Sequence, residues 1–292
     1  MNQVNKPDLS IIILSYKSKE HLKVLLPSIF ASTKKYSYEV IVVDNDSKDG
    51  TAESVESLLP SIPNLKLIRN QNNGFSAGNN VGIKQAQGKY VLLLNPDTKV
   101  EPSTFEVMLD FMEGRQDVGI SGCKIIKADG KLDLACRRRF PNPWNSFKRL
   151  FLLNNKNYNY SDMDENKEME VDSVVGAFML IRKSLIEKIG LLDEQFFMYG
   201  EDLDYCWRCK EAGQKVWYYP VTFITHYKGS SSQKTPFKAL KWFHDAMWVF
   251  YKKHYKDSYP AILNWLVWLG IKFRLYLLLV VNSFKSEPRV SK

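Results

Sequence analysis

The side chains best placed to do chemistry follow directly after short apolar runs. Residues 90–94 form an almost wholly apolar run that ends in Asn95, Pro96 and Asp97. Such a run is typical of a buried parallel strand, and ligands of open α/β sheets lie just beyond the carboxyl ends of these strands. A carboxylate there suits a divalent cation that carries a phosphorylated substrate. The same triplet is also typical of a plain turn, because all three residue types favour turns.

Two further apolar runs end in polar side chains. One leads into Ser15 and Tyr16, and the other, at residues 39–43, leads into Asp44. Because the carboxyl ends of parallel strands meet at one edge of a sheet, we expect these side chains near Asp97. The strand ends carry neither the glycine pattern of dinucleotide-binding oxidoreductases nor that of P-loop NTPases. An aromatic ring and two carboxylates suit a nucleoside diphosphate held through a cation.

A second cluster of acids opens a predicted helix over residues 201–211. Glu201 and Asp202 follow an aromatic lead-in at residues 196–199. The helix dipole alone favours acids at a helix start, without any function. The bulky lead-in also makes the surroundings partly apolar, which helps to tune a carboxylate as a general base. Asp202 in the first turn can project toward the rim of the sheet.

The elements that would carry these side chains alternate between strand and helix over the first hundred or so residues. Repeated βα units of this length imply a parallel, doubly wound sheet. The predicted strands cover residues 9–14, 39–44, 65–68 and 89–94, and the predicted helices cover residues 21–32, 49–59, 74–86 and 102–113.

The pattern changes in the following stretch of chain, where strands lack regular helices between them. Residues 154–170 are polar and acidic and indicate a loop. The helix over residues 201–211 is stopped by Gly213. Strand patterns cover residues 118–126, 132–140, 171–181, 216–219 and 222–225.

Size and cysteine content bound the class of protein. The 292 residues, 45% of them apolar, suffice for one large domain or two coupled ones. Four scattered cysteines do not form a secreted disulfide framework. The first eight residues are polar and lack signal-peptide character. We therefore expect a reducing, cytoplasmic setting.

Basic charge is concentrated at the carboxyl-terminal end. Residues 213–292 hold 13 Lys and Arg against 3 Asp and Glu, whereas the rest of the chain holds 28 against 29. Residues 237–255 have a helical pattern rich in Lys and aromatic residues. Residues 261–281 are strongly apolar but carry Lys272 and Arg274 near their middle. Central charges are costly in a spanning helix.

We therefore expect an amphipathic helix pair lying in the plane of a membrane surface. Its tryptophans would sit at the level of the lipid head groups; they are Trp242, Trp248, Trp265 and Trp268. Packing on the catalytic body or an oligomer interface are the alternatives. A nucleic-acid-binding tail is disfavoured, because the basic residues are interleaved with long aliphatic runs.

These motifs occur together in one order, and together they resemble glycosyltransferase family 2 with the GT-A fold, a Rossmann-like α/β fold with a mixed acceptor-side half. The form of the triplet ending at Asp97 and the block at residues 197–204 resemble the rhamnosyltransferase branch. The resemblance covers roughly residues 9–230. The motifs that carry it are residues 15–17, 42–47, 73–80, 94–97 and 200–204.

For the donor, the resemblance implies that Asp44 accepts a hydrogen bond from the ring N–H of a uracil or thymine base on which Tyr16 stacks. Asp97 would bind Mg²⁺ or Mn²⁺ on the diphosphate, and His226 would complete the metal site. Asn95 stands where many members have Asp, which removes one charge from that site. The other implied donor contacts are Ser15, Gly74, Asn80 and Asn95.

For the acceptor, the resemblance implies that Asp202 is the base that deprotonates a hydroxyl. Three consecutive arginines are typical of a clamp on phosphate, or of a strand with outward charges. Cys206 and Cys209 share one helix face, which suits packing better than a zinc or redox site. The tentative acceptor or diphosphate contacts are Arg137, Arg138, Arg139, Glu201 and Trp144.

The resemblance thus implies an inverting hexosyltransferase of cell-surface glycan synthesis. The donor that the resemblance favours is dTDP-L-rhamnose. A UDP-linked galactofuranosyl, galactosyl or N-acetylhexosaminyl donor is the alternative. The acceptor would be a lipid-diphosphate-linked or polysaccharide glycan at the inner face of the cell membrane. An inactive glycan- or membrane-binding module is disfavoured by the presence of Asp97 and Asp202.

We expect three parts in the chain. Residues 1–114 would form the nucleotide-sugar-binding half and residues 115–232 the half that binds the acceptor and carries the base. Residues 233–292 would form a basic, aromatic helical segment for membrane association. No nucleic-acid partner is expected.

Overall fold

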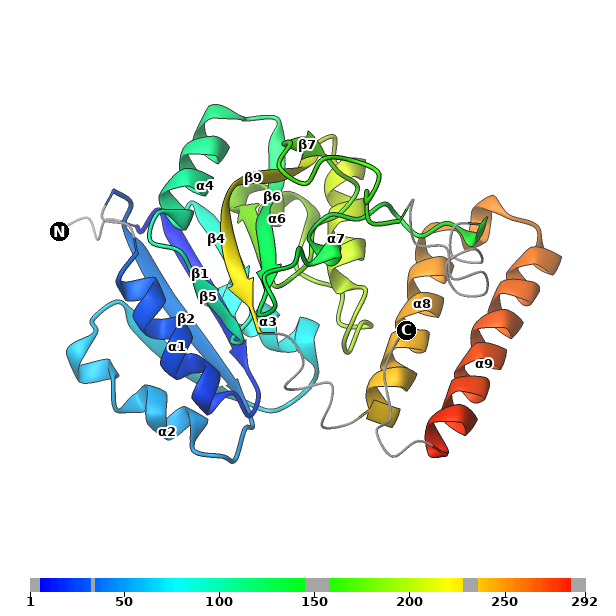
Figure 1. Ribbon diagram of the computed structural model, residues 1–292, viewed down its shortest axis with the longest axis horizontal. Coiled ribbons are helices and arrows are strands. Elements are labelled where there is room, and N and C mark those ends of the chain that lie inside the picture. The colour runs from blue at the N-terminus through cyan, green and yellow to red at the C-terminus, as the bar shows by residue number, and fades with distance from the viewer. Residues whose placement is uncertain (1–5, 33–34, 145–157, 228–235, 285–292) are drawn as a thin grey trace.

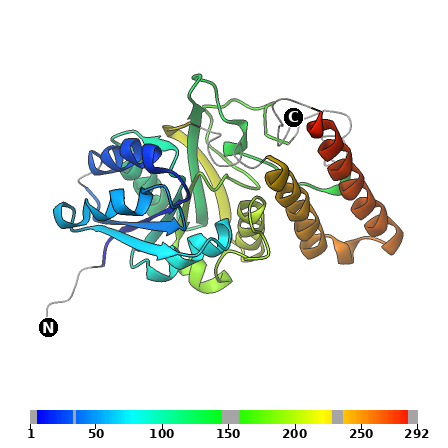
Figure 2. The same cartoon turned by 90° about the horizontal axis from the view of Figure 1, so that it is seen from below.

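The chain forms one nine-stranded sheet over the residues that the structure describes, with helices on both faces (Figures 1 and 2). The structure is a computed structural model, and it describes residues 6–32, 35–144, 158–227 and 236–284. The strands are β1 (Leu9–Ser15), β2 (Tyr38–Asn45), β3 (Leu65–Asn70), β4 (Tyr90–Leu94), β5 (Thr98–Val100), β6 (Val118–Lys127), β7 (Met169–Glu170), β8 (Phe178–Arg182) and β9 (Lys215–His226).

The α-helices lie between and after these strands. α1 and α2 cover one face of the sheet, and α3, α6 and α7 cover the other (Figure 2). The helices are α1 (Lys19–Phe30), α2 (Thr51–Glu56), α3 (Phe75–Gln85), α4 (Thr104–Gly114), α6 (Lys183–Ile189), α7 (Glu201–Glu211), α8 (Pro236–His254) and α9 (Ala261–Ser283).

The first half of the sheet is parallel, as the alternation of strand and helix predicts. The strands lie in the order β3, β2, β1, β4, and each pairs with its neighbours in parallel. The cores of β1 and β2 are fully buried, because helices cover both faces of a parallel sheet. This burial explains why their sequences are continuous apolar runs rather than alternating ones. The doubly wound prediction is confirmed here.

The second half of the sheet is mixed. β8 pairs antiparallel with β4 and with β6, and β9 runs parallel to β6. The short strand β5, which the sequence did not reveal, pairs antiparallel with β9 and places Thr98 opposite His226. At three residues β5 is too short for a periodic signal.

Several predicted elements of this half are corrected. Residues 132–140 form no strand; they make a 3₁₀ turn at Leu134–Cys136 and isolated bridges. Of residues 171–181 only the last part is strand, and α6 follows it directly. The two short strands at residues 216–219 and 222–225 are one strand, β9, with a register shift near its middle. α7 has the predicted bounds.

α8 and α9 form an antiparallel hairpin beside the sheet domain (Figures 1 and 2). A small apolar cluster of Phe196, Ala246 and Phe250 packs α8 against the segment before α7. Asp204 of α7 adds a polar anchor, since its carboxylate lies 2.8 Å from both Lys253 Nζ and His254 Nε2. The predicted alternative in which the tail packs on the catalytic body therefore holds for α8.

α9 packs along α8 through a face that includes both of its charges. Arg274 Nη1 lies 2.8 Å from His244 Nε2, and Lys272 Nζ lies 3.5 Å from Asp245. The opposite face of α9 is apolar and exposed, with a spacing of three and four residues that is typical of one helix face. Its exposed residues include Ile262, Trp265, Leu269, Phe273, Tyr276, Leu277 and Val280.

Replacing Asp204 by Asn should destabilise the protein by about 3 kcal/mol, because removing one partner of a buried ion pair leaves the other uncompensated. Burial would raise the pKa of Asp204, but His254, Lys253 and Arg208 outweigh it and lower that pKa. The stabilising contribution is therefore complete above about pH 4 and is lost as the pH falls through the lowered pKa.

Denaturant unfolding at pH 7 measures this loss. Asp257→Asn, at an exposed position beyond α8, is the matched control and should leave the free energy of unfolding unchanged. Equal stability of the Asp204→Asn variant and the wild type would show that this carboxylate does not anchor α8.

Candidate active site

A cavity of about 1630 Å³ extends from the carboxyl ends of the central strands to the α8–α9 hairpin. At the sheet it is lined by Tyr16, Asn95 and Asp97. Farther along, Asp202 lines it from the first turn of α7. The structure thus brings into one cavity the carboxylate predicted to hold the donor's cation, Asp97, and the carboxylate predicted to activate the acceptor, Asp202.

Asp97 and His226 meet because β5 pairs with β9. Oδ1 of Asp97 lies 3.1 Å from Nε2 of His226, and Nδ1 of the same ring lies 3.6 Å from Oδ2 of Asp133. Burial would lower the pKa of His226, but Asp133 and Asp97 outweigh it and raise that pKa. Burial would raise the pKa of Asp97, but His226 outweighs it and lowers that pKa. The sequence offered no signal for Asp133.

The donor set at this place suits a cation shared with a substrate. Within the described ranges, no group of three or more His, Cys, Asp and Glu side chains is arranged to hold a metal ion. Asp97 and His226 offer two ligands, with the Asn95 amide nearby on the same cavity wall. Mg²⁺ is commonly held by one or two carboxylates together with the oxygens of a substrate phosphate. The residues present fit that arrangement.

Ser15 and Asp44 lie side by side on β1 and β2. The Oδ2 atom of Asp44 accepts a hydrogen bond from the Ser47 N–H at 3.2 Å. Its Oδ1 atom and the Ser15 Oγ atom are buried and have no hydrogen-bond partner among the described residues. A buried hydrogen-bond acceptor without a partner lowers stability by about 1–3 kcal/mol. These two oxygen atoms are therefore suited to accept hydrogen bonds from a bound ligand.

Asp44 opens into a smaller hollow of about 290 Å³, which Arg69 also lines. Tyr16, 37% exposed, follows Ser15 and lines the large cavity instead. The aromatic ring and the carboxylate predicted to hold a base therefore line two different hollows at the carboxyl ends of the paired strands β1 and β2.

Gly74 is held in a close approach that only glycine allows. It begins α3 with φ of 100°, and a Cβ atom on it would lie 2.6 Å from the Phe197 carbonyl oxygen. The neighbouring Phe75 N–H donates to that same oxygen at 2.6 Å. Gly74 lines the cavity as predicted.

Asn80 does not reach the cavity. Its Nδ2 donates to the Leu192 carbonyl and to Glu194, both at 2.9 Å, and its Oδ1 accepts from the Leu192 N–H at 3.0 Å. This fully used amide ties α3 to the segment before α7. Asn80 was predicted to contact the sugar donor; in the structure it positions α3 against this segment instead.

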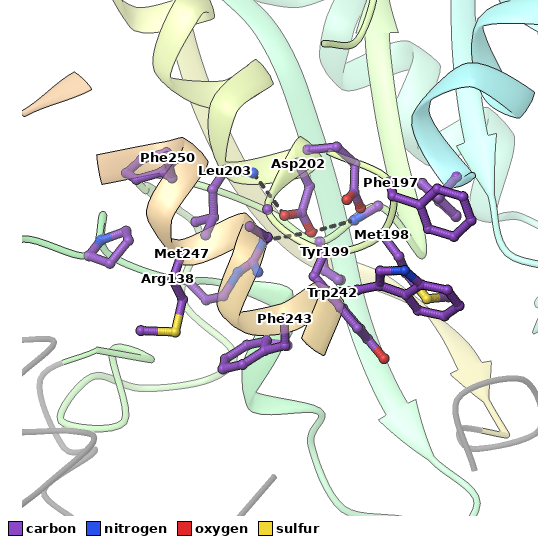
Figure 3. A pocket seen from close by; sticks show the side chains of 18 of the residues that line it. Arg138, Phe197, Met198, Tyr199, Asp202, Leu203, Trp242, Phe243, Met247 and Phe250 are labelled. Atoms are coloured by element: carbon purple, nitrogen blue, oxygen red, sulfur yellow. Dashed lines mark hydrogen bonds and ion pairs between the residues drawn. The ribbon is translucent and has the colours of Figure 1, made fainter. Parts of the chain in front are cut away.

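Asp202 is held by three donors. Its Oδ2 lies 2.9 Å from Arg138 Nη2 and 3.1 Å from the Gly176 N–H, and its Oδ1 accepts from the Leu203 N–H at 2.8 Å (Figure 3). Burial would lower the pKa of Arg138, but the charge of Asp202 outweighs it and raises that pKa. The carboxylate is therefore fixed in position, and Asp202 still lines the cavity.

Glu201 lines the cavity beside Asp202. Burial and the neighbouring charge of Asp202 raise the pKa of Glu201 above its usual value. Its Oε2 atom is buried and has no hydrogen-bond partner among the described residues. The surroundings of Glu201 thus favour its protonated form.

The three consecutive arginines have three different environments, and only Arg138 lines the cavity. Arg137 is buried and donates to the carbonyls of Asp164 and Met163, both at 2.8 Å. The guanidinium of Arg139 lies 4.0 Å from the ring centre of Tyr160. The triple clamp on phosphate is thereby reduced to one arginine.

The remaining predicted residues divide between the cavity and the core. Trp144 is exposed and lines the cavity. Cys206 and Cys209 are buried, and burial raises the pKa of both thiols. Their packing role therefore fits the structure better than metal or redox chemistry.

Aromatic contacts join α8 to the catalytic segment, which the sequence did not reveal. Phe197 stacks on Trp242 with ring centres 4.6 Å apart, and Tyr199 meets Phe243 edge-on at 5.9 Å (Figure 3). Trp242 was predicted at the level of lipid head groups, yet it lines the cavity. The aromatic lead-in to α7 explains this placement, because it supplies the partner rings.

The comparison with protein families decides the class of this chain. The family described as Glycosyl transferase family 2 matches residues 10–190. The chain belongs to glycosyltransferase family 2. The motifs at the ends of β1, β2 and β4 all lie within the matched region.

Relatives of this glycosyltransferase include two rhamnosyltransferases. The N-acetylglucosaminyl-diphospho-decaprenol L-rhamnosyltransferase of Mycobacterium tuberculosis is 25% identical over 312 residues, which cover 97% of each chain. Rhamnosyltransferase WbbL of Escherichia coli is 26% identical over 239 residues, which cover 80% of this chain and 88% of the relative.

Solved structures agree on the GT-A fold. S. aureus TarS in complex with UDP-GlcNAc aligns with a TM-score of 0.62 at 17% identity, over 95% of this glycosyltransferase and 75% of that chain. The mannosyltransferase PcManGT from Pyrobaculum calidifontis, in complex with GDP-Man and Mn²⁺, aligns with a TM-score of 0.60 at 16% identity, over 98% and 78%.

Replacing Gly74 by Ala should destabilise the enzyme by about 3 kcal/mol. Gly74 combines its positive φ with ψ of −179°, a conformation that costs a non-glycine residue about 1 kcal/mol, and the collision with Phe197 adds about 2 kcal/mol of overpacking. Gly190→Ala is the matched control, because Gly190 has φ of 80° and ψ of −168° and open space around it. Denaturant unfolding of both variants separates the two costs, and equal losses would contradict the close approach.

Proposed function

We propose that this glycosyltransferase transfers a sugar with inversion from a nucleoside diphosphate to a hydroxyl group of a lipid-diphosphate-linked glycan. The first donor proposed is dTDP-L-rhamnose. One observation carries the proposal: Asp97 with His226 and Asp202 with Arg138 line the same cavity from two separate parts of the fold. The Mycobacterium tuberculosis relative, whose name describes L-rhamnosyl transfer to such a lipid diphosphate, supports the choice of substrates.

The donor would bind across the sheet end of the cavity and the smaller hollow at Asp44. The unpaired Oδ1 of Asp44 would accept from the ring N–H of a uracil or thymine base, with Tyr16 covering the base. Asp97 and His226 would hold Mg²⁺ or Mn²⁺ against the diphosphate. When bound, the cation supplies positive charge that offsets the charge on the leaving group.

The acceptor hydroxyl would lie between Asp202 and the sugar carbon. Arg138 and the Gly176 N–H fix the carboxylate, so that it takes the proton as the hydroxyl oxygen attacks opposite the leaving diphosphate. Glu201 is poorly suited to this role, because its surroundings favour the protonated form. A single displacement inverts the anomeric centre and needs no covalent intermediate.

A UDP-linked donor is the alternative within the same chemistry, because uracil and thymine present the same ring N–H to Asp44. Thermal stabilisation by a panel of dTDP- and UDP-sugars, with and without Mn²⁺, separates these donors and measures how far binding depends on the metal.

The Asp202→Asn variant should lose transfer by a factor on the order of 10²–10⁴, while donor binding stays near that of the wild type. The asparagine keeps the size of the side chain but cannot take the proton. Steady-state transfer and calorimetric binding of the donor measure the two quantities. Robust turnover by this variant would remove Asp202 from the role of base.

The α8–α9 hairpin is proposed to hold the enzyme at the cytoplasmic membrane surface. Among the described residues, α9 is the one helix whose length and apolar composition would allow it to cross a membrane. Its charges Lys272 and Arg274 face partners on α8, and α8 is anchored to α7. An in-plane position with the exposed apolar face in the lipid fits these contacts better than a spanning one.

The double variant Phe273→Ser, Leu277→Ser should bind anionic liposomes at least tenfold more weakly, because both side chains are exposed on the apolar face of α9. Val221→Ser, at an exposed apolar position on β9, is the matched control. Liposome co-sedimentation measures the binding, and unchanged sedimentation of the double variant would exclude this face as the membrane contact.

A further inference from the structure

The cavity continues past Asp202 into an apolar end formed by the hairpin. Trp242, Phe243 and Met247 line it from α8. The described α9 residues that line it are all apolar or glycine, namely Leu263, Leu266, Val267, Gly270 and Ile271. These residues follow the three- and four-residue spacing of one helix face, next to the face that is exposed outward.

Positive charge lines the same cavity as the catalytic acid and this apolar end. Arg138 points toward Asp202, with Phe243 and Met247 nearby (Figure 3). Its buried Nε has no hydrogen-bond partner among the described residues. Lys238, at the start of α8, also lines the cavity. One cavity thus offers a base, cations and an apolar wall, which together suit a molecule with a hydroxyl, a phosphate and a hydrocarbon chain.

Gly270 leaves room for such a chain at the wall. It lies within α9, where glycine destabilises a helix relative to alanine. A Cβ atom built on it would meet nothing within 4 Å. Gly270 itself lines the cavity, and no side chain fills the space beside it.

We propose that α8 and α9 form the groove for the hydrocarbon chain of the acceptor, with the acceptor phosphate at Arg138. This proposal rests on the proposed function, since it assigns the lipid part of the same acceptor. It adds a specificity-determining surface: the hairpin selects acceptors by their chain, apart from holding the enzyme on a membrane.

Binding of decyl phosphate and of methyl phosphate, measured by calorimetry below the critical micelle concentration, tests the groove without donor or turnover. Each buried methylene adds about fourfold in affinity, so the wild type should bind decyl phosphate at least tenfold more tightly than methyl phosphate. Gly270→Phe should abolish that difference by filling the groove. Gly270→Leu, which is smaller, should reduce it without lowering the thermal midpoint, because leucine favours a helix more than glycine does.

Two controls locate the chain. Gly114→Phe places the same ring at a helix glycine with open space at the end of α4 and should keep the full difference. Phe273→Ser, on the outward face of α9, should also keep it. Equal affinity of the wild type for both phosphates, an unchanged difference in both Gly270 variants, or loss of the difference in Phe273→Ser would each overturn the groove.

Failure here is distinguishable from failure of the proposed function. If sugar transfer to soluble acceptors occurs but decyl phosphate gains nothing from its chain, the groove is wrong and the transferase stands. If the chain binds as described but no nucleotide sugar is turned over, the site binds an amphiphile and the proposed reaction is wrong.

Discussion

The arrangement of this enzyme depends on burying three carboxylates in the first turn of one helix. Glu201, Asp202 and Asp204 are all buried at the start of α7. The helix dipole favours acids there, but it cannot by itself compensate charges removed from water. Each buried carboxylate must therefore be stabilised by partners of its own or be protonated, and the partners place the segments that build the cavity.

Asp202 draws Arg138 and the Gly176 N–H to the cavity. Asp204 holds the end of α8 through Lys253 and His254, and this orients the hairpin. Burial and the charge of Asp202 favour Glu201 in its neutral form. The first turn of α7 thus fixes the catalytic side of the cavity, and it also anchors α8, which forms a wall of the cavity and holds the hairpin. The donor side is fixed separately, by the β5–β9 pairing that brings His226 to Asp97.

The sequence predicts those parts of this fold that are set locally. The strands that end at or just before Ser15, Asp44 and Asn95 are continuous apolar runs, and α7 has a clear start and a glycine stop. The predicted bounds of these elements therefore lie close to the observed ones. Residues 132–140 read as a strand, because their apolar pattern does not reveal that Arg137 binds two carbonyls of a distant loop. Long-range contacts of this kind leave no periodic signal.

The same limit applies to the site. Asp97, His226 and Asp202 were expected at one place, because the motifs of this chain together resemble glycosyltransferase family 2, and the structure brings them to one cavity. Asn80 and Trp242 were assigned other surroundings, since their partners Leu192 and Phe197 lie more than forty residues away in sequence. Asp133 was not expected at all, for the same reason.

The most direct test of the mechanism is the anomeric configuration of the product. Proton NMR of the disaccharide linkage, compared with that of the nucleotide sugar consumed, shows whether the configuration at the transferred carbon changes. A single displacement with Asp202 as base predicts inversion. Retention of configuration would contradict it, because retention requires a second displacement or a front-side departure that this account excludes.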